Sequence, residues 1–268
     1  MDVAIRGAPV DSNTPGFAFA PRQRTFKCFS DKDTSGLLRK WGIVPHVRMS
    51  EFGFRQGLAL GNDKQVERFL LDFFNSADVQ RHLASGGEGK KATPSGSFAS
   101  LEWERVPCTL VKTAVFKKFE EASLVSHTGS IRGCMDEVYD GITSCNLIVD
   151  MFLNEDTENM DVLEENEMEE VLVRIFKMLV CGGGMNQNDE KLSPYTQAAT
   201  MMYKDLIAVQ KNPSSGAIET VSSVFSISGG KDGNLFPHPD SPHNVCFVAV
   251  NPILRTATFF SFAFIPWC

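Results

Sequence analysis

The residues whose types could bind a metal ion gather in one short stretch, His238-Pro239-Asp240-Ser241-Pro242-His243. His238 and Asp240 have the His-x-Asp spacing with which non-haem iron oxygenases supply two of their three facial ligands. The third ligand would come from a later strand, and the chain has no histidine after His243. Pro239 and Pro242 restrict the backbone, so joint coordination by His243 is strained. We therefore interpret the stretch as a turn. The alternative is an iron- and 2-oxoglutarate-dependent oxygenase, or a small-molecule-binding protein, that uses the His238–Asp240 turn.

The sequence lacks the residues for two other kinds of site, a phosphate-binding loop and a catalytic nucleophile. A phosphate loop requires Gly-x-x-x-x-Gly-Lys-Ser/Thr, but Ala84 stands five positions before Gly89, and Lys91 takes the place of the hydroxyl residue. Cys108 and Cys181 have no histidine near them in the sequence, and there is no Gly-x-Ser-x-Gly elbow. We therefore predict no catalytic residue, no cofactor and no metal ion, and we interpret residues 85–97 as an exposed Gly/Ser/Lys loop.

Composition limits the class of protein. The 268 residues are 43% hydrophobic and 22% charged, which is ordinary for a folded domain. The net charge of −7 and the lack of a Lys/Arg-rich run argue against nucleic acid as a partner. No apolar run is long enough to span a bilayer and the N-terminus does not resemble a secretory signal, so we expect an intracellular, soluble protein with no membrane insertion. The seven cysteines form no disulfide pattern.

The elements that must position these residues include a pair of amphipathic helices at about 164–181 and 194–210. Apolar residues recur at helical spacing in both, and Cys181-Gly182-Gly183-Gly184 ends the first. Ser193 is expected to cap the second, with Pro194 at its first position. The apolar residues are Met168, Val171, Leu172, Ile175, Phe176 and Leu179 in the first helix, and Tyr195, Ala198, Ala199, Met202, Leu206 and Val209 in the second. The acidic residues of 150–170 are typical of a solvated loop entering a helix, or of a surface that binds a basic partner.

The remaining pattern predicts a mostly antiparallel sheet. We expect extended segments at 16–19 and 25–29, helices at 30–41 and 111–119, and a helix through Val66 and Phe73 that Asn62 or Asp63 caps. Strands are predicted at 98–103, 218–227, 245–250 and 256–265, the last two joined by a hairpin. In the final strand Phe260, Phe262 and Phe264 share one face, whereas Phe259 and Ile265 share the other, so both faces should be covered. The prediction is an α+β fold, with the helix pair packed on the sheet, a single domain over 16–268 and a flexible segment at 1–15.

An ordered set of short segments resembles the cilia- and flagella-associated protein 300 family. The set comprises Cys181-Gly182-Gly183-Gly184, Ser193-Pro194-Tyr195, Tyr203-Lys204-Asp205-Leu206, Lys211-Asn212-Pro213 and Ser222-Ser223-Val224-Phe225, together with Gly16-Phe17, Thr25-Phe26, Trp41, Phe52-Gly53-Phe54, Val106-Pro107-Cys108-Thr109 and Asn251-Pro252. The resemblance implies a non-enzymatic protein of the cytoplasm and of the cilium or flagellum, including its axoneme. It implies a role in the assembly or intraflagellar transport of outer and inner dynein arms. The implied partners are dynein arm assembly factors, axonemal dynein and the intraflagellar transport machinery.

Within this set Tyr203, Lys204 and Asp205 are the candidates for binding a partner. Leu206 lies on the apolar stripe with Met202, which leaves Lys204 and Asp205 pointing away from it. An exposed charged pair adds no more than about 1 kcal/mol to folding, so binding explains the pair better than stability does. The alternative is that both side chains are merely solvated.

Overall fold

The computed structural model describes residues 16–85, 94–110, 113–184 and 186–266. The segment 1–15, predicted to be flexible, and positions 86–93 of the predicted loop lie outside the described residues.

Six antiparallel strands form the main sheet in the order β1-β2-β10-β9-β8-β3. Their bounds are β1 Phe19–Arg22, β2 Val47–Phe54, β3 Ser95–Val106, β8 Ser223–Asn234, β9 Val245–Asn251 and β10 Thr256–Phe262. Helices make up the other main component of the chain, so the predicted α+β class is confirmed. The hairpin between β9 and β10 is also confirmed, and Asn251 organises its turn by accepting hydrogen bonds from the N–H groups of Ile253 and Leu254.

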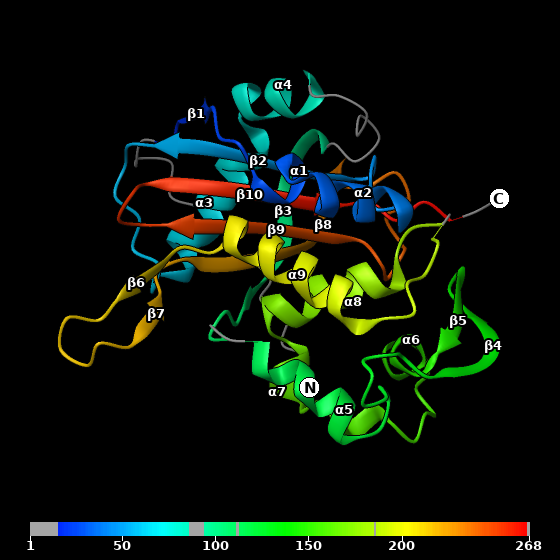
Figure 1. Ribbon diagram of the computed structural model, residues 1–268. Helices are drawn as coiled ribbons and strands as arrows, with labels where there is room; N and C mark the ends of the chain where they lie inside the picture. The colour runs from blue at the N-terminus through cyan, green and yellow to red at the C-terminus, as the bar shows by residue number, and fades with distance from the viewer. Residues whose placement is uncertain (1–15, 86–93, 111–112, 185, 267–268) are drawn as a thin grey trace.

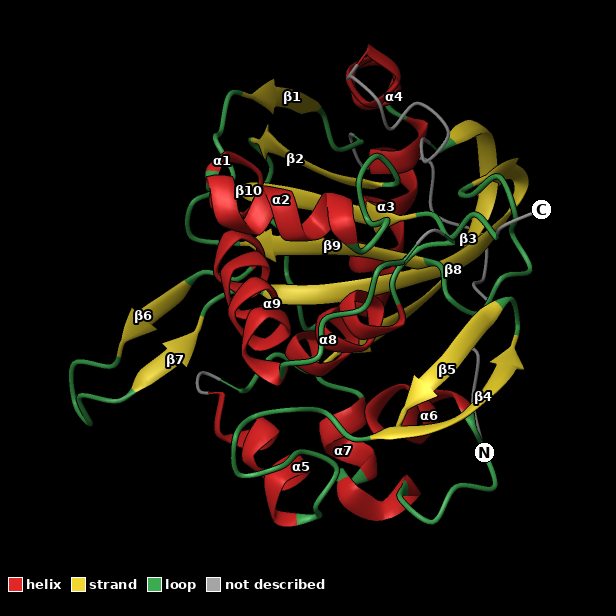
Figure 2. Cartoon of the chain, turned by 45° about the vertical axis from the view of Figure 1, so that its right-hand side comes forward, coloured by secondary structure: helices red, strands yellow, loops and turns green. Residues whose placement is uncertain are grey.

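The sheet is covered on both faces, as the alternation in the last strand predicted (Figure 2). Phe260, Phe262 and Phe264 belong to one hydrophobic core, and Phe259 belongs to the other. On the side of Phe259 lie α3 (Asp63–Asn75) and α4 (Ala77–Ser85). On the opposite side lie α1 (Lys27–Ser30), α2 (Lys32–Lys40), α8 (Val171–Cys181) and α9 (Leu192–Leu206) (Figure 1). The predicted packing of the central helix pair on the sheet is therefore confirmed.

Helix α3 forms for the local reasons that its sequence indicates. Asn62 accepts a hydrogen bond from the N–H of Gln65 at 3.2 Å and so caps the helix. Val66, Phe69, Leu70 and Phe73 are each 0% exposed, because their spacing of three and four places them all on the face against the sheet.

The helix predicted at 164–181 is interrupted, so the prediction of one continuous helix was wrong. It consists of α7 (Glu165–Met168) and α8, separated at Glu169 and Glu170. The N–H of Val171 donates to the carbonyl of Pro107 at 2.9 Å instead of continuing the helical ladder. The buried carboxylate of Glu170 accepts hydrogen bonds from the N–H groups of Thr109 and Leu110. A distant segment of chain thus decides where α8 begins.

Helix α9 begins at Leu192 and ends at Leu206, so neither predicted end was right. Lys191 occupies the N-cap position and Ser193 lies inside the first turn. After Ile207 the chain enters β6 (Val209–Lys211), which pairs only with β7 (Ile218–Thr220) in a hairpin that projects from the body (Figure 1). Val209 is 51% exposed and does not belong to the apolar stripe.

Several smaller predictions also need correction. The segment predicted as extended at 25–29 contains α1, and the strand predicted at 218–227 is divided between β7 and β8. Residues 95–97 of the predicted loop already belong to β3. The helix predicted at 111–119 is a 3-10 turn, η2 (Thr113–Lys117), followed by α5 (Lys118–Glu121); positions 111 and 112 lie outside the described residues.

The acidic run belongs to a part of the chain that the sequence did not predict. It contains β4 (Gly133–Tyr139), β5 (Ile142–Asn146), α6 (Leu147–Leu153) and the 3-10 turn η3 (Met160–Val162), beside α5 and α7 (Figure 2). Aromatic contacts attach it to α8, since the ring centroid of Phe176 lies 4.5 Å from that of Phe116 and 6.1 Å from that of Phe152. The side chain of Phe176 is fully buried, as its place on the apolar stripe predicted.

Candidate interaction surface

The stretch from His238 to His243 forms a turn between β8 and β9. The side chain of Asn244 donates to the carbonyl of His238 at 2.6 Å, and the N–H of Ser241 donates to the same carbonyl at 3.2 Å. His238 and Asp240 are exposed, whereas His243 is partly buried against the ring of Phe264. Within the described residues no three His, Cys, Asp or Glu side chains are grouped so that they could hold a metal ion. The fold therefore does not bring together the ligands that the oxygenase alternative requires.

The two thiols considered as nucleophiles are buried. Burial raises the pKa of Cys181 to about 12, and it also raises the pKa of Cys108, whose Sγ donates to the carbonyl of Ser222 at 3.2 Å. A reactive cysteine needs the opposite shift. The fold does bring His243 into the same cavity as Cys181, although the two are far apart in sequence.

Two of the three partner-binding candidates face the interior. Tyr203 is 6% exposed and its hydroxyl donates to the carbonyl of Cys108 at 3.2 Å. Asp205 is 5% exposed and its carboxylate accepts the N–H of Cys28 at 2.8 Å. The prediction that Asp205 points into solvent was wrong, because α1 packs across the end of α9 and supplies a buried donor there.

Lys204 is exposed, as predicted, and it lines a hollow with residues from two distant parts of the chain. Arg24 and Lys27 lie across this hollow from α9, and Arg24 also borders a second hollow together with Arg22. We call Arg22, Arg24, Lys27 and Lys204 the basic strip. Arg24 forms an ion pair with Glu51 at 2.7 Å and donates to the carbonyl of Asp205 at 2.7 Å. In the part of the chain that the structure describes, no carboxylate lies within ion-pair distance of the other three cations.

Sequence reasoning missed three members of the basic strip. Arg22, Arg24 and Lys27 are close together in the sequence and were available as a signal. These three residues do not form a continuous basic run. Lys204 lies near them only because α1 packs against α9 in the folded protein.

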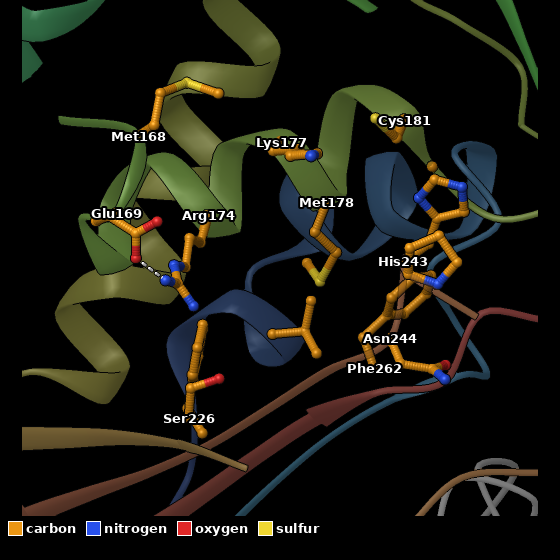
Figure 3. A pocket seen from close by; sticks show the side chains of 14 residues that line it. Met168, Glu169, Arg174, Lys177, Met178, Cys181, Ser226, His243, Asn244 and Phe262 are labelled. Atoms are coloured by element: carbon orange, nitrogen blue, oxygen red, sulfur yellow. Dashed lines mark hydrogen bonds and ion pairs between the residues drawn. The ribbon is translucent and has the colours of Figure 1, made fainter. Parts of the chain in front are cut away.

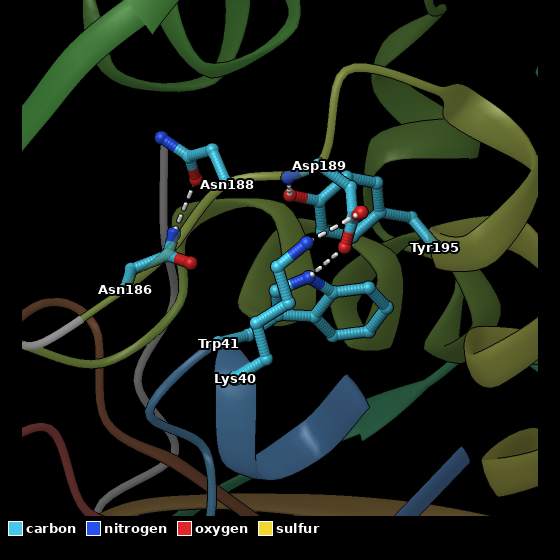
Figure 4. Close-up of polar contacts among 6 residues, drawn as sticks. All are labelled: Lys40, Trp41, Asn186, Asn188, Asp189 and Tyr195. Atoms are coloured by element: carbon cyan, nitrogen blue, oxygen red, sulfur yellow. Dashed lines mark hydrogen bonds and ion pairs between the residues drawn. The ribbon is translucent and has the colours of Figure 1, made fainter. Parts of the chain in front are cut away.

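Two of the segments that carry the family resemblance, at Trp41 and at Tyr195, meet in a buried contact (Figure 4). The indole of Trp41 is 0% exposed, stacks on the ring of Tyr195 at 4.3 Å and donates from Nε1 to the carboxylate of Asp189 at 2.7 Å. Lys40 forms an ion pair with the same carboxylate at 2.7 Å, and the N–H of Asp189 donates to the Tyr195 hydroxyl at 2.8 Å. These bonds fix the loop before α9.

The Val106–Thr109 segment has a similar structural role. It receives Glu170 from the start of α8 and the hydroxyl of Tyr203 from α9. The two central helices are therefore attached by hydrogen bonds to the segment that follows β3.

No helix in the described ranges is long and apolar enough to cross a membrane.

Comparison with known proteins identifies relatives of the chain. The model of the family described as cilia- and flagella-associated protein 300 matches residues 16–262. A protein of that name from Chlamydomonas reinhardtii is 27% identical over 246 residues, which cover 89% of this chain and 94% of the relative. Another from Paramecium tetraurelia is 28% identical over 239 residues, which cover 89% of this chain and 90% of the relative. No solved structure matches.

Proposed function

The chain belongs to the cilia- and flagella-associated protein 300 family, and on this premise we propose that it is a non-enzymatic factor for axonemal dynein arms. It acts in the cytoplasm to assemble outer and inner arms, in their intraflagellar transport to the axoneme, or in both. Its partners in this proposal are dynein arm assembly factors, axonemal dynein and the intraflagellar transport machinery.

The basic strip is the observation that supports a binding role. The chain as a whole carries a net charge of −7, yet four cations line two neighbouring hollows that share Arg24. Three of these cations lack an ion-pair partner among the described residues, so each of them is available to a carboxylate of another protein. Charges of this kind raise the rate and specificity of association with a surface of opposite sign. The partner surface at this strip is therefore acidic.

The buried neighbours of Lys204 have a supporting role in this proposal. Tyr203 and Asp205 hold the last turn of α9 against Cys108 and Cys28. Lys204 is thereby presented from a fixed helix end, so less side-chain and backbone freedom is lost when a partner binds.

The experiment that tests this function is a rescue of ciliated cells that lack the protein. The variant replaces Arg22, Lys27 and Lys204 with Glu; Arg24 is left intact because its bond to Asp205 supports the fold. A control variant reverses two charges elsewhere by replacing Lys64 and Lys231 with Glu, since both are exposed and neither lines the two hollows of the strip. Both variants should melt at the wild-type temperature.

We expect the strip variant to capture less of the dynein arm assembly factors and to leave axonemes with fewer outer and inner arms. The control variant should restore the capture of assembly factors and the number of dynein arms to the wild-type level. Normal arms with the strip variant at wild-type abundance would exclude the strip as the binding surface. Normal arms in cells that lack the protein altogether would reject the proposed function itself.

A further inference from the structure

The two strands β6 and β7 form a ribbon that stands out from the body of the protein (Figure 1). The side chains of Val209 and Ile218 are 51% and 57% exposed, and those of Gln210, Lys211 and Glu219 are exposed as well. Two paired strands that bury so little are at best marginally stable in water by themselves. The ribbon therefore owes its shape to the contacts at its two ends.

Hydrogen bonds hold the ribbon at its turn and at its base. At the turn, the side chain of Asn212 accepts the N–H of Ser214 at 2.8 Å and donates to the carboxylate of Glu219 at 2.7 Å. At the base, the N–H of Val221 donates to the carbonyl of Ala208 at 2.8 Å. The strands are thus extended before anything binds to them, which lowers the entropy that binding costs.

The register of the ribbon decides which main-chain groups of β6 face β7. The N–H of Asn212 donates to the carbonyl of Ala217 at 2.8 Å. Bonded and non-bonded pairs alternate in an antiparallel ladder, so Gln210 faces β7, whereas the N–H and C=O groups of Val209 and Lys211 point away from it. Within the described residues no hydrogen bond reaches these outward groups. The edge of β6 therefore offers two donors and two acceptors.

The side chains along this edge are one apolar group and one cation. Val209 and Lys211 lie on the same face of the ribbon, because they are two positions apart in a strand. Lys211 is exposed, and no carboxylate of the described residues lies within ion-pair distance of it. Arg174 on α8 differs, because an ion pair to Glu169 holds it (Figure 3). Lys211 is thus available to a carboxylate of another molecule.

The opposite edge of the ribbon, on β7, is less open. Thr220 is partly buried at the base, and its side chain forms a hydrogen bond with the thiol of Cys108. The outward-pointing residues of β6, in contrast, are both exposed. The edge of β6 is therefore the more accessible of the two.

We propose that β6 binds an extended acidic segment of a partner protein as a third, antiparallel strand. An apolar side chain of this segment packs beside Val209, and a carboxylate two positions earlier in the segment pairs with Lys211. In recognition of this kind the main-chain hydrogen bonds provide affinity and the alternate side chains provide specificity. The inference does not rest on the proposed function, and the edge shares no residue with the basic strip.

A second copy of this chain fits the edge less well. Antiparallel pairing of two β6 strands would bring both Lys211 side chains onto one face of the shared sheet, where like charges repel. A lysine on an edge strand is a common protection against such self-pairing. A partner that carries a carboxylate at this place turns the same lysine into an attractive contact.

The test uses the purified full chain and the peptide acetyl-(Glu-Thr-Val-Thr)2-amide, in which each glutamate precedes a valine by two positions. Amide hydrogen exchange is followed by NMR. In the free protein the amides of Val209 and Lys211 should exchange faster than those of Gln210 and Asn212, and the peptide should slow the first two. Equal rates in the free protein, or rates at Val209 and Lys211 that millimolar peptide leaves unchanged, would overturn the proposal.

Two further peptides separate the main-chain and charge contributions. One carries lysine in place of both glutamates, and the other is N-methylated at both valines, which removes main-chain donors. Each should bind about tenfold more weakly than the first peptide in an NMR titration. Equal affinity of all three would mean that the ribbon is not extended by a third strand, and would reject the proposal.

A matched pair of variants locates the edge. Val209→Pro removes an outward N–H of β6, and Ile218→Pro does the same on β7; proline is tolerated in an edge strand where the N–H faces solvent. Both should keep the wild-type Tm. Val209→Pro should weaken binding of the first peptide about tenfold, whereas Ile218→Pro should not change it. The opposite result, or no change in either variant, would rule out the edge of β6.

A charge exchange tests the role of Lys211. Lys211→Glu should weaken binding of the glutamate peptide and strengthen binding of the lysine peptide, so that the order of the two affinities is reversed. An unchanged order would show that Lys211 does not contact the bound segment, and would overturn the proposed specificity.

Sedimentation velocity of the protein alone tests the second copy as the occupant. We expect the wild type and Val209→Pro to have the same sedimentation coefficient. A wild-type dimer that Val209→Pro converts to a monomer would assign the edge to self-association and overturn the proposal.

Discussion

Asp205 and Lys204 are neighbours in sequence that the fold places in opposite environments. The carboxylate of Asp205 accepts a hydrogen bond from the N–H of Cys28 in the interior, whereas Lys204 lies at the surface as part of the basic strip. A helix turns by about 100° per residue, so adjacent side chains point in clearly different directions. The interior of this protein extends around more of α9 than its apolar stripe suggests.

Replacement of Asp205 by Ala should lower the free energy of unfolding by about 2 kcal/mol, because a buried N–H is left without an acceptor. Lys204→Ala, at the adjacent exposed position, should change it by less than about 0.5 kcal/mol. Urea denaturation of the two variants measures the difference. Equal midpoints would show that Asp205 is solvated in solution.

His243 should make the stability of the protein depend on pH. Its pKa in the folded protein lies below the ordinary value of 6.5, because burial and then the charge of Lys177 disfavour the imidazolium, whereas Asp140 acts in the opposite direction. Below the ordinary value the unfolded chain therefore binds a proton that the folded protein does not. The free energy of unfolding should fall as the pH decreases from neutrality through this range.

Comparison of the wild type with His243→Phe isolates the contribution of His243 to the pH dependence, since all the other titratable groups are present in both proteins. The wild type should lose more stability than the variant over the same decrease in pH. Parallel curves of unfolding free energy against pH would contradict the assigned environment of His243.

At the scale of elements, the loop between α8 and α9 is held very close to the end of α2. A Cβ atom added at Gly183 would lie 2.2 Å from the carbonyl oxygen of Gly42, which is too close for any side chain. The N–H of Gly183 donates to the carbonyl of Trp41 at 2.9 Å across the same contact. Close approach of two backbone segments therefore explains this glycine.

Gly183→Ala should destabilise the protein by more than about 1 kcal/mol, because the two backbones must separate to admit a methyl group. Gly36→Ala is the matched control, since Gly36 lies in α2 and its added methyl group would meet nothing within 4 Å. The control should be more stable than the wild type by about 0.5–1 kcal/mol, because alanine favours the helix. Thermal unfolding of both variants tests the pair, and opposite signs are the expected result.

At the scale of the whole molecule, one sheet joins two hydrophobic cores. Phe259 and Phe260 are consecutive residues of β10 and both are 0% exposed, yet they belong to different cores. If the sheet couples the two layers, loss of either side chain should destabilise the same cooperative unit.

Phe259→Ala and Phe260→Ala should each lower the free energy of unfolding by about 3–5 kcal/mol. Each variant should still show one transition that coincides when followed by far-ultraviolet and near-ultraviolet circular dichroism. This measurement also tests the single domain predicted for 16–268. Two separate transitions in either variant would show that the layers unfold independently.

The sequence by itself determined the features that depend on neighbouring residues. The stripe and cap of α3, the hairpin between β9 and β10, and the two apolar faces of β10 all follow from spacing within one segment. Such patterns predict structure because a side chain's direction is set by the local helical or extended backbone. The ordered segments that indicated the family were also a property of the sequence, and the family match confirms them.

Only the tertiary structure decided what lies beside each element. The carbonyl of Pro107 sets the start of α8, the backbone of Cys28 requires the carboxylate of Asp205, and Lys204 joins Arg22, Arg24 and Lys27 in one strip. His243 likewise reaches Lys177 and Cys181 only when the turn before β9 packs against α8. Burial and charge at these positions depend on residues that are distant in the chain, and spacing within one segment carries no information about them.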